Sequence, residues 1–194
     1  MNYLAHAYLS FHDPQVLVGN MISDFVKGKK QYDYPEGIQK GIKLHRMIDL
    51  FTDQHGATKR AKELLKPAVG PYAGAFIDVV YDHFLATDPD IHDADTWMEF
   101  SATTYRLLEP QMHHFPEKFA RMFPYMKTQN WLYNYRFNWG IERSFEGVAR
   151  RASYLSPEND AFQLFELHYD QLKASYSQFF PEVKKLALDL LHDQ

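Results

Sequence analysis

The chain has 194 residues, of which 45% are hydrophobic, 24% are charged and none is cysteine. These values are typical of one soluble globular domain, and they exclude disulfides, thiolate nucleophiles and cysteine-ligated metal sites. The formal net charge of −4 argues against a general nucleic-acid-binding protein, because such proteins usually present a cationic surface.

The pattern of apolar residues is helical along nearly the whole chain. Asp13-Pro14 is typical of an N-cap followed by proline at the first helical position, and it predicts a helix from residue 14 that ends near Gly28. Further helices are predicted over residues 35–52, 55–66, 71–86, 96–108, 116–122, 128–135, 141–154, 157–179 and 181–192. An acidic loop is predicted over residues 88–95. We find no repeat or linker, and therefore predict an all-α, single-domain helical bundle over residues 1–194.

Targeting and membrane signals are missing from this pattern. The first residues, MNYLAHAYLSFHD, contain no basic region followed by a long apolar run. No apolar run approaches the roughly 20 residues of a membrane span. We therefore expect a cytoplasmic protein without a membrane partner, and the sequence gives no indication of its oligomeric state.

Histidine and aspartate residues recur inside the apolar helical segments. In GIKLHRMIDLFTDQH, His45, Asp49 and Asp53 follow one another at steps of four, which places them on one helical face. Other polar residues in apolar surroundings are His6, Asp24, Asp78, Asp82 and His83. A buried carboxylate is costly unless it is paired or binds a cation, so we expect these groups to meet. Nitrogen and oxygen ligands without sulfur suit Mn²⁺, Mg²⁺, Fe²⁺ or Zn²⁺.

Each of these residues also has a purely structural interpretation. His6 can be a hydrogen-bonded core histidine, and Asp24 can accept bonds from the N-terminus of a neighbouring helix. His45 with Asp49 can be an ordinary polar pair one helical turn apart. Only their joint occurrence favours a metal site.

Basic and aromatic residues give a second indication. Arg46 and the pair Arg150-Arg151 are candidates for binding phosphate oxygens, although Arg150-Arg151 can equally be a solvated helix end. The aromatic residues between positions 131 and 139 are predicted to line the core or a groove.

Several segments, in order, resemble the acyl carrier protein phosphodiesterase family. They are MNYLAHAYLS, VGNMISDFVKG, GIKLHRMIDLFTDQH, DVVYDHFLA and WLYNYRFNWGI with a following ARR, all within residues 1–151. The resemblance implies an all-helical, divergent relative of the HD-domain phosphohydrolases that uses a divalent metal ion, with Mn²⁺ favoured. It also implies that holo-acyl carrier protein is the substrate, and that the enzyme hydrolyses the phosphodiester between 4′-phosphopantetheine and a serine.

The resemblance carries over to individual positions. The family's recurring polar residues are His6, Asp24, His45, Arg46, Asp49, Asp78, Asp82 and His83. The His-Asp dipeptide of the wider HD superfamily reads His45-Arg46 here, so another carboxylate must complete the ligand set.

We assign roles within this set as expectations. Asp24, His45 and Asp82 are expected to hold the ion. His6 is expected to be a fourth ligand. Asp49 is expected to orient the attacking water or act as base. His83 is expected to protonate the serine oxygen, and Arg46 to neutralise charge on the phosphoryl oxygens.

Two other functions fit the same residues. The first is an HD-like phosphohydrolase that acts on a nucleotide or another small phosphodiester. The second is a non-enzymatic helical binding protein whose histidines and aspartates form a structural polar network.

Overall fold

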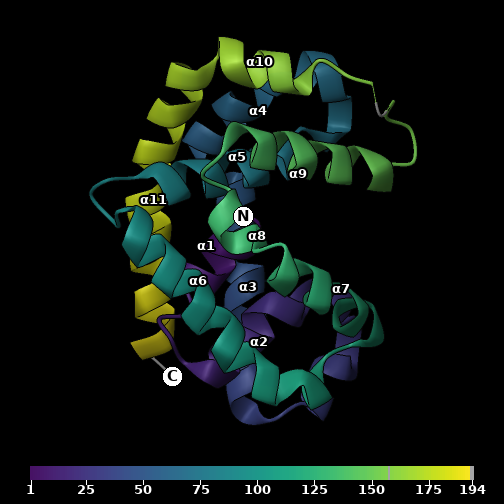
Figure 1. The fold of residues 1–194 in the computed structure, drawn as a ribbon, viewed down its shortest axis with the longest axis vertical. Helices are drawn as coiled ribbons and strands as arrows, with labels where there is room; N and C mark the ends of the chain where they lie inside the picture. Colours follow the sequence, from purple (N-terminus) through teal and green to yellow (C-terminus); the bar gives the residue numbers. More distant parts are fainter. Residues whose placement is uncertain (157, 193–194) are drawn as a thin grey trace.

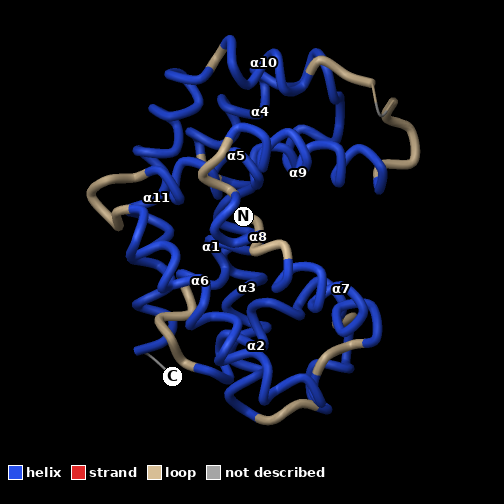
Figure 2. Tube along the Cα trace, in the orientation of Figure 1, coloured by secondary structure: helices blue, strands red, loops and turns tan. Residues whose placement is uncertain are grey.

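All regular elements of the structure, a computed structural model that describes residues 1–156 and 158–192, are helices (Figures 1 and 2). The α-helices are α1 (Tyr3–Tyr8), α2 (Pro14–Ile22), α3 (Glu36–Gln54), α4 (Gly56–Val69), α5 (Ala73–Thr87), α6 (Ala94–Leu108), α7 (Glu117–Thr128), α8 (Trp131–Asn134), α9 (Asn138–Arg151), α10 (Ala161–Leu167) and α11 (Tyr169–His192). Short 3-10 helices are η1 (Ser23–Phe25), η2 (Gly28–Asp33), η3 (Gly70–Tyr72) and η4 (Glu109–His114). The predicted all-α class is confirmed. No helix in the described ranges has the length and apolar character needed to cross a membrane.

Several predicted boundaries are wrong. The helix predicted to reach Gly28 ends at Ile22 and continues as the tighter turns η1 and η2. Helix α4 continues past Pro67, and α11 continues past Pro181. A proline removes one backbone hydrogen bond, but these helices each bury an apolar face that holds them together across the interruption.

The remaining differences concern short or displaced helices. Helix α1 was not predicted, and the helix predicted over residues 128–135 is only the short α8 (Trp131–Asn134). The long helix predicted over residues 157–179 is two helices, α10 and the first part of α11. Its predicted start at Pro157 lies outside the described residues.

Helices α2 and α3 pack closely, backbone against backbone. A Cβ atom added to Gly19 would overlap the carbonyl oxygen of Ile38, and one added to Gly41 would overlap the carbonyl oxygen of Val16. Only glycine allows two helices to pack this closely. The close packing places the end of α2 directly against the middle of α3.

Helix α1 lies in the middle of the fold, where it packs against α2, α5 and α8 (Figure 1). Helix α11 runs along one side and packs against α3, α4 and α5. The first residues of the chain therefore connect the α2–α3 pair to α5. The polar residues predicted from the sequence lie around this junction.

Candidate active site

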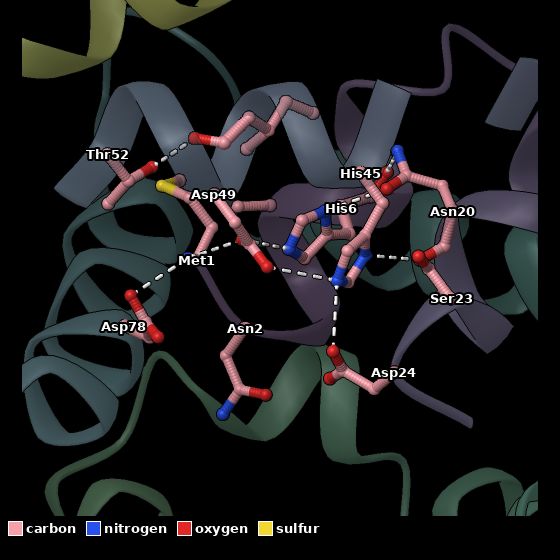
Figure 3. Close-up of polar contacts among 12 residues, drawn as sticks. Met1, Asn2, His6, Asn20, Ser23, Asp24, His45, Asp49, Thr52 and Asp78 are labelled. Atoms are coloured by element: carbon pink, nitrogen blue, oxygen red, sulfur yellow. Dashed lines mark hydrogen bonds and ion pairs between the residues drawn. The ribbon is translucent and has the colours of Figure 1, made fainter. Parts of the chain in front are cut away.

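Four segments bring polar side chains together beside the chain start. Helix α1 supplies His6, the end of α2 supplies Asn20, η1 supplies Asp24, and α3 supplies His45 and Asp49 (Figure 3). Both histidines are buried, with 3% and 5% of their surfaces exposed. Their rings stack with centroids 3.9 Å apart and planes inclined by 15°. We call His6, Asp24, His45 and Asp49 the His/Asp cluster.

Asp49 lies against the Nε2 atoms of both rings, and Asp24 lies against that of His45. His45 Nε2 lies 3.2 Å from Asp24 Oδ1 and 3.1 Å from Asp49 Oδ2. His6 Nε2 lies 3.3 Å from Asp49 Oδ1. The ring atoms Nε2 of both histidines thus point into a space shared with carboxylate oxygens.

Asn20 determines which ring nitrogens carry hydrogen. Its Nδ2 donates to the carbonyl oxygen of His6 and to Ser10 Oγ, so its Oδ1 must be the atom that accepts from His6 Nδ1, at 2.7 Å. His45 Nδ1 donates to the main-chain oxygen of Asn20, also at 2.7 Å. When neutral, both histidines therefore present the lone pair of Nε2 to the shared space, which is the arrangement found in metal-ligating histidines.

Two buried atoms of the cluster have no hydrogen bond. His6 Nε2 and Asp49 Oδ1 are both inaccessible to solvent, and although 3.3 Å apart they do not have hydrogen-bonding geometry. Buried polar atoms are nearly always hydrogen-bonded, so this pair indicates that something else binds there. One ligand atom each from His6, His45 and Asp49 lie within 4.8 Å of one another, as the ligands of a single metal ion do. Their nitrogen and oxygen chemistry fits a divalent ion.

Without a metal ion, a proton must supply the positive charge of the cluster. Burial opposes ionisation of His45, but hydrogen bonds to Asp24 and Asp49 outweigh it and raise its pKa to about 9. Burial and the neighbouring charge of His45 lower the pKa of His6 to about 4. Burial would raise the pKa of the Asp49 carboxyl, but the adjacent His45 and His6 rings and the Met1 ammonium group hold that pKa well below its ordinary value. The cluster is thus built around one cation, either a proton or a metal ion.

The α-amino group of Met1 borders the cluster on the side away from Asp24. It is 2.8 Å from Asp78 Oδ1 and 3.5 Å from Asp49 Oδ1. Burial would lower its pKa, but the two carboxylates raise the pKa to about 10. Asp78 is therefore connected to the cluster through this ammonium group rather than directly (Figure 3).

The structure places Asp82 and His83 away from the shared space. Asp82 is completely buried and accepts hydrogen bonds from the backbone N–H groups of Asn2, Leu4 and Ala5 at 3.2, 2.7 and 3.2 Å. It thereby binds the N-terminal end of α1, where N–H groups lack helical partners. His83 Nδ1 donates to the carbonyl oxygen of Tyr135 at 2.8 Å, and its Nε2 lies 3.1 Å from the Tyr169 hydroxyl.

Arg46 also lies outside the shared space. Its guanidinium donates to the main-chain oxygen of Val26 at 3.0 Å and to Gln31 Oε1 at 2.6 Å. Arg46 therefore holds the η1–η2 segment, which carries Asp24, against α3.

Sequence reasoning missed the role of Asn20. Its position one turn before Asp24 in an apolar segment was the available signal, but the contact that matters most uses its main-chain oxygen. Because every residue has a main-chain carbonyl group, the sequence does not indicate which one accepts this hydrogen bond.

Nearly the whole length of the chain is similar to proteins of one family. The family model described as acyl carrier protein phosphodiesterase matches residues 1–183. A protein of this name from Klebsiella pneumoniae subsp. pneumoniae is 34% identical over 192 residues, which cover 96% of this chain and 97% of the relative. Proteins of the same name from Photorhabdus laumondii and Escherichia coli O6:H1 are 32% and 29% identical over 188 and 192 residues, with 96% of this chain and 95% and 97% of the relatives covered. No solved structure matches the chain.

Proposed function

The chain belongs to the acyl carrier protein phosphodiesterase family, and from this membership we propose that it hydrolyses holo-acyl carrier protein with a divalent metal ion held by the His/Asp cluster. The bond cleaved is the phosphodiester between 4′-phosphopantetheine and a serine of the carrier. The products are apo-acyl carrier protein and free 4′-phosphopantetheine.

The buried atoms of the cluster that have no hydrogen bond support the presence of a metal ion in this proposal. His6 Nε2 and Asp49 Oδ1 are buried without hydrogen bonds, and His45 Nε2 faces two carboxylate oxygens. A purely structural network would pair these atoms with one another or with backbone groups. A cation ligated by His6, His45 and Asp49 would satisfy all three side chains at once.

The chemistry of the ligands indicates a class of metal ions rather than one ion. Two imidazole nitrogens and a carboxylate suit Mn²⁺, Fe²⁺ or Zn²⁺ better than Mg²⁺, which prefers oxygen ligands alone. Among these ions we propose Mn²⁺. Bound in the cluster, such an ion supplies Lewis-acid stabilisation of the phosphoryl charge and favours the ionisation of water.

Asp24 is the member of the cluster best placed to handle the proton of the attacking water. Its side chain is 69% exposed, whereas His45 beside it is almost fully buried. The hydrogen bond with His45 lowers the pKa of Asp24, so the carboxylate is ionised at neutral pH. As water attacks phosphorus, its proton passes to Asp24, and the bond from phosphorus to the serine oxygen breaks. The serine oxygen takes up a proton from solvent and leaves as a hydroxyl group, and Asp24 returns its proton to solvent.

Two of the other predicted residues are given positioning roles. Arg46 fixes the segment that carries Asp24, through its bonds to Val26 and Gln31. Asp78 lies closer to the Met1 ammonium group than Asp49 does, so this cation interacts with Asp78 as well as with Asp49. Both act through groups of the cluster rather than on the substrate.

Mass spectrometry of holo-acyl carrier protein tests the proposal. Incubation with the protein and Mn²⁺ is expected to remove the prosthetic arm, and a chelator is expected to prevent the loss. Asp24→Asn is expected to lose turnover while keeping Mn²⁺, since an amide cannot accept the proton. The matched control is Asp53→Asn on the same helix as Asp49, because Asp53 is exposed and pairs with Lys62 at 2.6 Å.

Two results would contradict the proposal. Cleavage of only a small generic phosphodiester would exclude the carrier protein as the substrate. Full turnover in the presence of chelator, with no metal found by elemental analysis, would exclude the metal ion.

A further inference from the structure

A pocket of about 650 Å³ lies at the start of the chain, where Asn2 and Tyr3 line it. Its walls come from the first residues of the chain, from the segment around α8 and from one face of α9. In Figure 1, α8 lies next to the chain start and α9 lies above it. Pockets of roughly 300–1,000 Å³ are the size that small molecules and cofactors occupy, whereas a folded carrier domain cannot enter one.

The face of α9 that lines the pocket combines open space with positive charge. Its lining positions are 139, 140, 143, 144, 146, 147, 150 and 151, which form two neighbouring rows with steps of three and four, as one helical face requires. At Gly147 an added Cβ would touch only Arg151 Nη1, at 3.7 Å, so glycine leaves this part of the pocket empty. A larger side chain at position 147 would therefore occupy part of the pocket.

Among the arginines of this face, Arg151 is the one available to bind a ligand. Arg150 pairs with Glu146 at 3.4 Å, and the Arg143 guanidinium stacks 5.4 Å from the Trp139 ring centroid. Arg151 is exposed and forms no hydrogen bond or ion pair with the residues that the structure describes. An arginine fork without a partner, on the wall of a pocket, is suited to bind phosphate oxygens.

Helix α1 contributes residues to both the pocket and the cluster. Asn2 and Tyr3 line the pocket, and His6 follows Tyr3 by one helical turn. Burial raises the pKa of the Tyr3 hydroxyl, Asp24 raises it further and Arg151 lowers it, so both charged groups lie within electrostatic reach of this hydroxyl. A phosphodiester at the cluster can therefore extend its organic arm into the pocket.

We propose that this pocket binds the 4′-phosphopantetheine arm of the substrate, with Arg151 bound to the phosphate oxygens. The inference rests on the proposed function. The arm is a narrow chain with two amide groups and an apolar dimethyl carbon. The side-chain amides of Asn2, Gln129 and Asn134 can exchange hydrogen bonds with its amides, and Trp131 offers apolar surface.

Titration calorimetry with free 4′-phosphopantetheine tests this pocket without any turnover. Two variants are used, Gly147→Leu, which fills the space, and Arg151→Gln, which removes the charge. Leucine favours a helix more than glycine does, so Gly147→Leu keeps α9 folded. The matched control is Arg121→Gln, an exposed arginine of α7 that does not line the pocket.

Both pocket variants are expected to bind the compound at least about tenfold more weakly than the wild type, which corresponds to the loss of one charge-assisted contact or of the available space. Their Mn²⁺ affinity is expected to stay unchanged. Pantetheine without phosphate is expected to bind the wild type and Arg151→Gln equally, because the arginine recognises the phosphate.

Either of two results would overturn the inference. One is wild-type affinity in Gly147→Leu, and the other is absence of binding to the wild type. Specific binding that both variants weaken, in a protein that leaves holo-acyl carrier protein intact, would keep the pocket and reject the proposed function.

Discussion

Two regions of the molecule carry similar histidine and aspartate patterns and use them differently. In the His/Asp cluster, His6, His45 and Asp49 come from two helices and aim ring nitrogens and carboxylate oxygens at one space. On α5, Asp82 and His83 are equally buried, but each polar atom of their side chains has a hydrogen-bond partner. The polar atoms of the second region are hydrogen-bonded within the fold, whereas two buried atoms of the first have no hydrogen bond.

The comparison shows that the partners of a buried polar residue, and not the residue itself, identify a site. Asp82 satisfies three backbone N–H groups of α1, and this capping holds His6 where the cluster needs it. His6 Nε2 has no such partner. The α5 region is thus a support for the cluster, and variants in the two regions are expected to fail in different ways.

The largest expected difference concerns catalysis. His45→Gln removes the nitrogen that faces both carboxylates, and we expect turnover of holo-acyl carrier protein to fall about 10³-fold or more, with loss of Mn²⁺ binding. The matched variant on α5 is His83→Gln, which is expected to keep Mn²⁺ binding within about threefold of the wild type. Equal losses in both variants, measured by mass spectrometry and metal titration, would erase the distinction between the regions.

The next effect concerns stability. Asp82→Ala leaves the backbone N–H groups of Asn2, Leu4 and Ala5 without acceptors in a buried site, and we expect the free energy of unfolding to fall by about 3–5 kcal/mol. Urea unfolding of the metal-free protein measures it, so that metal binding does not contribute. If Asp82 were instead a ligand, as predicted from the sequence, the variant would lose metal affinity with little change in metal-free stability.

A third effect is the dependence of metal-free stability on pH. The pKa of His45 is about 9 in the folded protein and about 6.5 when unfolded, so its ion pairs contribute fully below pH 6.5 and are lost as the pH rises through 9. The contribution is roughly 3 kcal/mol, because each pKa unit corresponds to about 1.4 kcal/mol. The Met1 amino group, whose pKa is raised from 8.0 to about 10, adds a loss of the same sign above pH 8, whereas the loss from Asp82, whose pKa is raised to about 7, is largely complete near pH 7.

The variant His45→Gln isolates this contribution in metal-free protein. Its stability is expected to fall less than that of the wild type between pH 6.5 and 9. Parallel curves for the two proteins would show that His45 carries no proton in the cluster. Saturation with Mn²⁺ is expected to abolish the difference in slope, because the ion takes the place of the proton.

The sequence predicted the helix class and the stripe that joins His45 to Asp49, because both follow from the helical period. It could not separate Asp49 from Asp82, since both are aspartates among apolar residues and the difference is a contact with residues 2–5, about 80 positions away. Helix α1 was missed for the same reason, as its N-terminal N–H groups are bound by that distant carboxylate.

The smallest expected effect concerns Asn20, which supports the cluster from α2. Asn20→Leu removes the oxygen that accepts from His6 Nδ1 but keeps the main-chain oxygen that accepts from His45. Only His6 loses its fixed orientation, so Mn²⁺ affinity is expected to fall by about 10- to 100-fold, as for other groups that orient metal-ligating histidines. Metal titration measures this, and Asn20→Asp is expected to restore most of the affinity, because a carboxylate oxygen accepts the same hydrogen bond. Mn²⁺ affinity that falls in the leucine variant and does not recover in the aspartate variant would contradict this role. Asn20 would then act through the hydrogen bonds that its Nδ2 donates to His6 and Ser10, which hold α1 against α2.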